Sequence, residues 1–217
     1  MSRLRLGSYL RDGGLFLTLR VGSGPLDPDF LDEVDGAIED ADLDSSVACV
    51  VFRIVQSLEP SSPRAPDDFP GGMIASRRRL DASIQAARRI PKLMILLLDG
   101  TLAGECIGLL ALADVVLATN ESVLRPGGVS AGLLGMVPVL ERSGDRVRPA
   151  LLCLLEGRDL DAHAARHLGL VTDVVPAERL ESVLDSLLRG VAAAGPTAVA
   201  MLKDAAKGSL SSGLRCP

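Results

Sequence analysis

The chain has few of the side chains on which nucleic-acid binding depends. Its 217 residues include no Trp, one Tyr and four Phe. With so few rings, stacking of bases on aromatic side chains is not an expected activity. The net charge of −5 also disfavours a nucleic-acid partner, because such proteins neutralise phosphates with an excess of Lys and Arg. Hydrophobic residues make up 47 % of the chain, so we expect an aliphatic core.

Cysteine and histidine are too scarce and too scattered for a metal site. The four cysteines are Cys49, Cys106, Cys153 and Cys216, and they lack the spacing of metal ligands or of a disulfide framework. No apolar run has the length of a membrane span, and the first residues lack the apolar core of a secretory signal. We therefore predict no bound metal, no membrane partner and a cytoplasmic protein with free thiols.

The apolar pattern predicts strands that alternate with helices, which is typical of an α/β fold. Expected strands are residues 4–10, 15–21, 47–55, 93–98, 115–118 and 170–175. Expected helices are residues 25–43, 73–89, 133–142, 147–156 and 159–168, then one from residue 176 and one over 196–207. Residues 56–72 contain four prolines and no periodicity, so we expect a long loop that is either functional or disordered.

The stretch DGTLAGECIGLLALAD, residues 99–114, follows the most apolar predicted strand. Asp99-Gly100 is turn chemistry, and Gly104 opens an apolar segment that fits a helix. A strand, a turn with glycine and a helix leave backbone N–H groups at the helix start, where they can hold an anion or the oxyanion of a thioester. We expect the amides from Gly104 to Cys106 to point into a cavity that receives a carbonyl oxygen.

Four segments resemble the crotonase superfamily, the relatives of enoyl-CoA hydratase and isomerase. In chain order they are IPKLMILLLDGTLAGECIGLLALADVVLA, ATNESVLRP, LLEGRDLDAHAARHLGLVTDVVPAERL and AGPTAVAMLKDA, and the resemblance covers about residues 47–207. It implies a ββα spiral fold with C-terminal helices, here shortened at the C-terminus. It also implies a single domain over residues 1–217, with a spiral core over about 1–145 and a helical part over about 146–210.

The same resemblance implies a substrate class and an oxyanion hole. The substrate is an acyl-CoA or a carrier-protein acyl thioester, with no separate cofactor, and two backbone N–H groups hold its enolate oxygen. One donor falls at Glu105 in the turn Gly104-Glu105-Cys106. The other falls after the strand 47–55, where Pro60 has no N–H and the donor shifts to Ser61 or Ser62.

The acid and base of this chain differ from those of the family's hydratases. The resemblance places their two glutamates at Gly108 and Gly127, and glycine transfers no proton. Glu105 is then either a relocated acid or base, or a carboxylate that the helix dipole stabilises. Arg125 is a candidate for meeting a carboxylate or phosphate. Cys106 fits a buried small side chain better than a nucleophile.

Two other groups of residues have a functional and a plain interpretation. His163 and His167 share one face of a predicted helix, but no third ligand near them completes a metal site. The run from Arg77 to Arg79 either meets the phosphates of coenzyme A or forms a solvated helix face.

Two hypotheses of different class follow from the resemblance. In the first, the chain is a lyase or isomerase that performs hydratase, isomerase or decarboxylase-type enolate chemistry with a nonstandard acid or base, in a polyketide-like biosynthetic pathway. In the second, it is a catalytically degenerate accessory subunit that assists a partner synthase, as in dihydroxyphenylacetyl-CoA formation. Either protein is expected to form a homo-oligomer, a trimer or hexamer.

Overall fold

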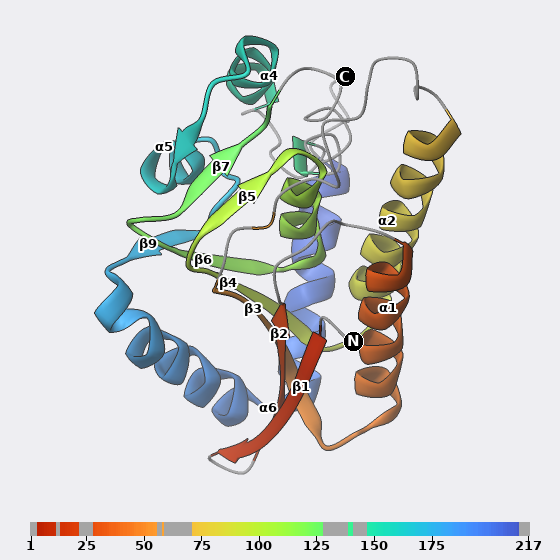
Figure 1. The fold of residues 1–217 in the computed structure, drawn as a ribbon. Helices are drawn as coiled ribbons and strands as arrows, with labels where there is room; N and C mark the ends of the chain where they lie inside the picture. Colours follow the sequence, from red (N-terminus) through yellow and green to blue (C-terminus); the bar gives the residue numbers. More distant parts are fainter. Residues whose placement is uncertain are drawn as a thin grey trace.

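The computed structural model describes residues 4–11, 14–21, 28–55, 58, 71–127, 139–140 and 147–212. Its main element is a six-stranded sheet with the order β1-β2-β3-β4-β6-β9 (Figure 1). The first two strands form an antiparallel hairpin, and the remaining neighbours pair in parallel. The strands are β1 (Leu4–Arg11), β2 (Gly14–Val21), β3 (Val47–Ile54), β4 (Leu93–Leu98), β6 (Val115–Thr119) and β9 (Asp173–Val175).

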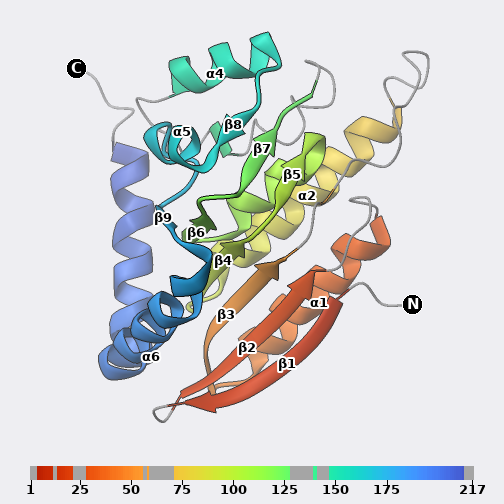
Figure 2. The same ribbon diagram turned by 60° about the vertical axis from the view of Figure 1, so that its left-hand side comes forward.

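Helices cover both faces of this sheet, which is why its central strand β4 is apolar throughout. α1 (Pro28–Leu43) and α2 (Gly71–Arg89) pack together on one face, and α6 (Leu180–Ser212) covers the other (Figure 2). Alternate residues of a strand therefore enter different cores. Val50 belongs to the core beneath α1 and α2, whereas Val51 packs in the second core with Leu184 and Leu188 of α6.

A second, three-stranded sheet has the order β5-β7-β8. It consists of β5 (Thr101–Ala103), β7 (Val123–Arg125) and β8 (Leu160–Asp161). The short 3₁₀ helix η2 (Gly104–Leu112) follows β5 directly and is almost entirely buried in the core beneath α1 and α2. The remaining elements are α4 (Val147–Glu156), α5 (Ala162–His167) and η4 (Ala177–Arg179).

α6 consists of two segments joined at Gly195, which has a φ of 77° and is followed by Pro196. A left-handed φ suits glycine, and the proline then starts the second segment. The second segment carries Lys203, whose side chain is 1 % exposed. Its ammonium group donates to the carbonyl oxygens of Ala87 (2.9 Å) and Lys92 (2.8 Å), and it lies 3.0 Å from a carboxylate oxygen of Asp114.

Several predicted elements need correction. The helix predicted over 159–168 spans only Ala162–His167, because residues 160–161 pair with β7 as β8. The strand predicted over 170–175 begins only at Asp173. The last helix, expected to end near residue 207, continues to Ser212. The helix predicted over 133–142 lies mostly outside the described residues, and the division at about residue 145 stays a prediction.

Candidate functional site

The predicted site begins where β4 ends and the chain enters the second sheet. The Asp99 N–H donates to the carbonyl of Ile54 at the end of β3 (2.8 Å), which holds the two strand ends together. β5 then leads into Gly104, which is buried and has a φ of 53°. That left-handed conformation favours glycine, so the residue type is explained by the turn it makes. The strand, the turn and the buried helical segment predicted here are therefore confirmed, although the segment is a 3₁₀ helix.

The first turn of η2 has the polarity of an anion site. Ala103 precedes it with extended backbone angles (φ −115°, ψ 145°), and an alanine side chain cannot cap the helix. Glu105 lies in the first turn and is half-buried. The amino end of a helical segment favours negative charge, through its N–H groups and its dipole. The Glu105 carboxylate therefore lies where the helix dipole stabilises it, which agrees with the interpretation that gives Glu105 no catalytic role.

Leu58 fixes the segment that follows β3 beside β5. Its N–H donates to the carbonyl of Thr101 (2.8 Å), and its own carbonyl accepts from the N–H of Ala103 (2.9 Å). Leu58 also forms a parallel bridge with Leu102 and is 3 % exposed. The chain after β3 is therefore held next to the residue that precedes Gly104. The two segments named in the prediction are thus neighbours as far as Leu58, and the two donors themselves stay a prediction.

The second predicted donor comes three residues after Leu58. Ser61 lies outside the described residues, as do Pro60 and Ser62. Ser61 as an oxyanion-hole donor therefore stays a prediction. What the structure adds is Leu58, an apolar residue in a polar, proline-rich stretch, which the sequence analysis did not single out.

Arg125 ends β7, which runs parallel to β5 and places Arg125 in register with Ala103. The second sheet thus brings Arg125 beside the turn, although the two residues are far apart in the chain. Its Nε lies 3.0 Å from Oδ2 of Asp159, and both side chains are about half exposed (50 % and 49 %). Arg125 does meet a carboxylate, but one of its own chain. A ligand anion would have to share the guanidinium with Asp159 or displace it.

Buried hydroxyl groups support the junction between the two sheets. Thr119 donates to the carboxylate of Asp99 (3.0 Å), and Ser122 donates to the carbonyl of Leu98 (2.8 Å). The two hydroxyl oxygens are also 3.0 Å apart, and both residues are at most 1 % exposed. Because both hydroxyl groups donate to residues at the end of β4, they tie that end to the chain after β6. Asp99 has the structural role that its turn position predicts.

The two glycines that the resemblance places at the glutamate positions belong to η2 and to the chain after β7. Gly108 is buried inside η2, and Gly127 follows β7 by two residues with a φ of 71°. A Cβ added at Gly157 would lie 3.1 Å from the Gly127 carbonyl oxygen, so the chain is closely packed there. The correspondence of both glycines to catalytic glutamates stays a prediction.

The remaining candidates have plain structural roles. Cys106 is 1 % exposed within the core. Cys49, a different cysteine, is also buried, and burial raises the pKa of its thiol well above the ordinary value. His163 and His167 are exposed on α5 and line a polar cleft of about 590 Å³. Within the ranges that the structure describes, no three His, Cys, Asp or Glu side chains gather to hold a metal ion. In the same ranges, no helix is both long and apolar enough to cross a bilayer.

Comparison with known proteins gives consistent matches. A family model described as enoyl-CoA hydratase/isomerase matches residues 73–215. The probable enoyl-CoA hydratase EchA12 of Mycobacterium tuberculosis is 32 % identical over 115 residues, which cover 51 % of this chain and 40 % of that protein. The mitochondrial enoyl-CoA hydratase domain-containing protein 3 of Danio rerio is 30 % identical over 142 residues, which cover 65 % and 48 %. The chain thus spans about half the length, or less, of these curated relatives.

A solved structure shows the fold over nearly the whole chain. The enoyl-CoA hydratase/isomerase family protein from Silicibacter pomeroyi superposes with a TM-score of 0.79 at 22 % identity, covering 95 % of this chain and 91 % of that one. This likeness confirms the predicted crotonase-like α/β fold.

Proposed function

We propose, from the premise that this chain belongs to the enoyl-CoA hydratase/isomerase family, that it binds an acyl-CoA or carrier-protein acyl thioester at the turn between β5 and η2. The observation that carries the proposal is the bridge from Leu58 to Leu102 beside Gly104. It holds together the two chain segments from which the oxyanion donors would come. No separate cofactor is required, since the thioester itself is the activated group.

In this proposal, the thioester carbonyl oxygen lies against the Glu105 N–H and a second N–H from Ser61. Charge develops on that oxygen when the bond at the α-carbon breaks, and fixed N–H donors stabilise it more strongly than they stabilise the neutral carbonyl. The positive end of η2 contributes in the same direction. Gly104 gives the turn the left-handed backbone that starts η2 at this point.

The Glu105 carboxylate is the proposed acid or base. It takes a proton from the substrate and returns it at another carbon in an isomerisation, or to the leaving oxygen in a dehydration. Arg125 is proposed to bind an anionic part of the acyl group, in competition with Asp159. A decarboxylation needs only the donors and a proton source, so it is also compatible. Such reassigned chemistry suits a polyketide-like biosynthetic pathway.

The alternative is an accessory subunit that binds a thioester or a partner synthase without turnover. Glycine at positions 108 and 127 favours it, because neither residue can transfer a proton. In both cases we propose a homo-oligomer, a trimer or hexamer, in the cytoplasm.

The test combines binding with turnover. Thermal unfolding is followed with enoyl-, β-hydroxyacyl- and malonyl-type CoA thioesters, because a ligand of the folded state raises the melting temperature. If the protein is active, Glu105→Gln keeps the backbone N–H but should lower kcat by about 100-fold or more, with little change in KM. Glu178→Gln, an exposed position in η4, is the matched control and should leave kcat unchanged.

The outcomes separate the two hypotheses. A stabilised protein without turnover of any thioester supports the accessory subunit. Absence of both binding and turnover contradicts the thioester proposal as a whole. If Glu105→Gln retains full kcat, the carboxylate is not the acid or base, and only the role of the backbone N–H survives.

A further inference from the structure

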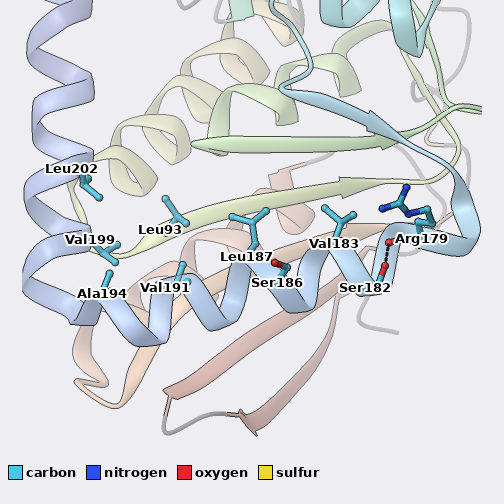
Figure 3. A pocket seen from close by; sticks show the side chains of 11 residues that line it. Leu93, Arg179, Ser182, Val183, Ser186, Leu187, Val191, Ala194, Val199 and Leu202 are labelled. Atoms are coloured by element: carbon cyan, nitrogen blue, oxygen red, sulfur yellow. Dashed lines mark hydrogen bonds between the residues drawn. The ribbon is translucent and has the colours of Figure 1, made fainter.

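A groove of about 650 Å³ runs along the first segment of α6 (Figure 3). Its walls come from that segment, from Arg179 at the end of η4, from Val199 and Leu202 beyond the break at Gly195, and from Leu93 at the start of β4. The residues of α6 that pack inward belong to the core on the opposite face of the main sheet from η2. The groove is therefore separate from the proposed thioester site.

Polarity changes from one end of the groove to the other. Arg179 lies at one end with Ser182, whereas Val199 and Leu202 lie at the far end (Figure 3). Arg179 is the only charged residue that lines the groove, and none of the described residues forms an ion pair with it. An anionic group at this end and an apolar group along the rest would complement the groove.

The groove is long and is open at its middle. From Ser182 to Ala194, α6 rises by about 18 Å at ~1.5 Å per residue. Small residues recur along this wall every four positions, at Ser182, Ser186, Gly190 and Ala194. A Cβ added at Gly190 would meet no atom within 4 Å, so the groove has unfilled space at that point. A groove of this length with a mostly apolar lining suits an extended alkyl chain.

We propose that this groove binds the anion of a medium- to long-chain fatty acid. The carboxylate pairs with the exposed Arg179 guanidinium, while the Ser182 hydroxyl donates to the Arg179 carbonyl oxygen (2.8 Å). The alkyl chain lies against Val183, Leu187 and Leu202, which removes their exposed surface and its own from water. A single cation at one end of an apolar groove fits one anionic head group better than the polar flanks of a partner helix.

The test is calorimetric titration of the 217-residue chain with dodecanoate below its micelle concentration. The expected result is saturable binding at one site per chain, weaker for octanoate and for an uncharged alcohol of equal length. Arg179→Gln should weaken dodecanoate binding by about two- to fivefold, as expected for an exposed ion pair. Methyl resonances of Val183, Leu187 and Val191 should shift on binding.

Filling the groove gives the stronger test. Gly190→Leu should weaken dodecanoate binding by about tenfold or more, because the new side chain occupies the space of the alkyl chain. Gly36→Leu is the matched control, since a Cβ added there also meets no atom within 4 Å but Gly36 lies on α1, away from the groove. The control should bind dodecanoate as the unchanged protein does.

Three outcomes would overturn the proposal. One is unchanged affinity in Gly190→Leu. A second is loss of affinity in Leu152→Ser, which would assign the binding to the exposed leucines of α4. The third combines two results: the unchanged protein does not bind dodecanoate, and Gly190→Leu converts an oligomer into monomers, as measured by light scattering. That result would assign the groove to a contact between copies.

Discussion

The two ends of the parallel strands β4 and β6 are completed by different kinds of contact. At the amino ends, Lys203 comes from a distant helix and is buried against Asp114 and two carbonyl groups. At the carboxyl ends, the hydroxyl groups of Thr119, which ends β6, and of Ser122, which follows it, hold Asp99 and Leu98, and the chain after β4 continues into β5 and η2. The amino ends are closed for stability, whereas the carboxyl ends lead to the proposed site, as in other parallel sheets.

The largest expected effect on the free energy of unfolding is at the amino ends of β4 and β6. Lys203→Met removes the cation and leaves the Asp114 carboxylate and two carbonyl groups without it. Breaking a buried ion pair on one side typically costs about 3–5 kcal/mol, and since Asp114 is 21 % exposed we expect the lower end, about 3 kcal/mol. Urea unfolding measures it. Thioester binding by the folded protein should not change.

Two controls sharpen this prediction. Arg189→Met changes an exposed cation of the same helix and should alter the free energy of unfolding by less than about 0.5 kcal/mol. The double variant Lys203→Met/Asp114→Asn removes both charges and should recover part of the lost stability. If Lys203→Met unfolds at the same urea concentration as the unchanged protein, the amino ends do not depend on this pair.

At the carboxyl ends of β4 and β6, we expect a substitution to change the free energy of unfolding less and thioester binding more. Gly104→Ala forces a side chain into a left-handed conformation, which should destabilise the protein by about 1–2 kcal/mol. It should also weaken thioester binding, because the turn that presents the donors shifts. Thermal unfolding with and without ligand measures both effects.

The matched substitution, at Gly36, should change the free energy of unfolding in the opposite direction. Gly36 lies within α1 in a conformation that does not require glycine, and a Cβ added there is unobstructed. Gly36→Ala should therefore stabilise the protein by about 0.4–1 kcal/mol and leave thioester binding unchanged. Equal effects of the two substitutions would mean that the turn at Gly104 has no special geometry.

The smallest expected effect is pH-dependent and returns to the amino ends. The Ser46 hydroxyl and N–H donate to the Asp44 carboxylate and hold the pKa of Asp44 below its ordinary 3.8. This contribution to stability is fully present above pH 3.8 and is lost as the pH falls through the lowered pKa.

Ser46→Ala removes the hydroxyl contact, so the variant should be slightly less stable than the unchanged protein at neutral pH. The difference should vanish in acid. Urea midpoints at about pH 7 and about pH 2 measure it. Ser186→Ala, at an exposed position of α6, should show no such dependence on pH. A difference that persists in acid would rule out titration of Asp44 as its cause.

The sequence predicted the parts of the fold that depend on long apolar patterns. The strands at residues 47–55 and 93–98 are nearly continuous apolar runs, and the first segment of α6 has its apolar residues at helical spacing. The turn at Gly104 was predicted from its local chemistry, since glycine shortly after a buried strand typically marks a change of backbone direction. The role of Glu105 comes from the family resemblance and stays a prediction.

What the sequence could not predict depends on partners far away in the chain. β5, β7 and β8 have two or three residues each, which is too short for an alternating pattern, and they exist because they pair with one another. Asp159 was expected within a helix, but it pairs with Arg125 instead. Lys203 has the pattern of a surface residue of an amphipathic helix, and only the packing of the second α6 segment shows it to be buried.

The contacts of Lys203 also bear on the order in which the chain folds. They join residues 116 and 111 positions apart, so their formation closes very long loops. Contacts of such high sequence separation form slowly, and during synthesis α2 and β4 are complete long before residue 203 is added. In a nascent chain, the contacts that Lys203 makes at the amino ends of β4 and β6 are therefore the last part of the sheet to form.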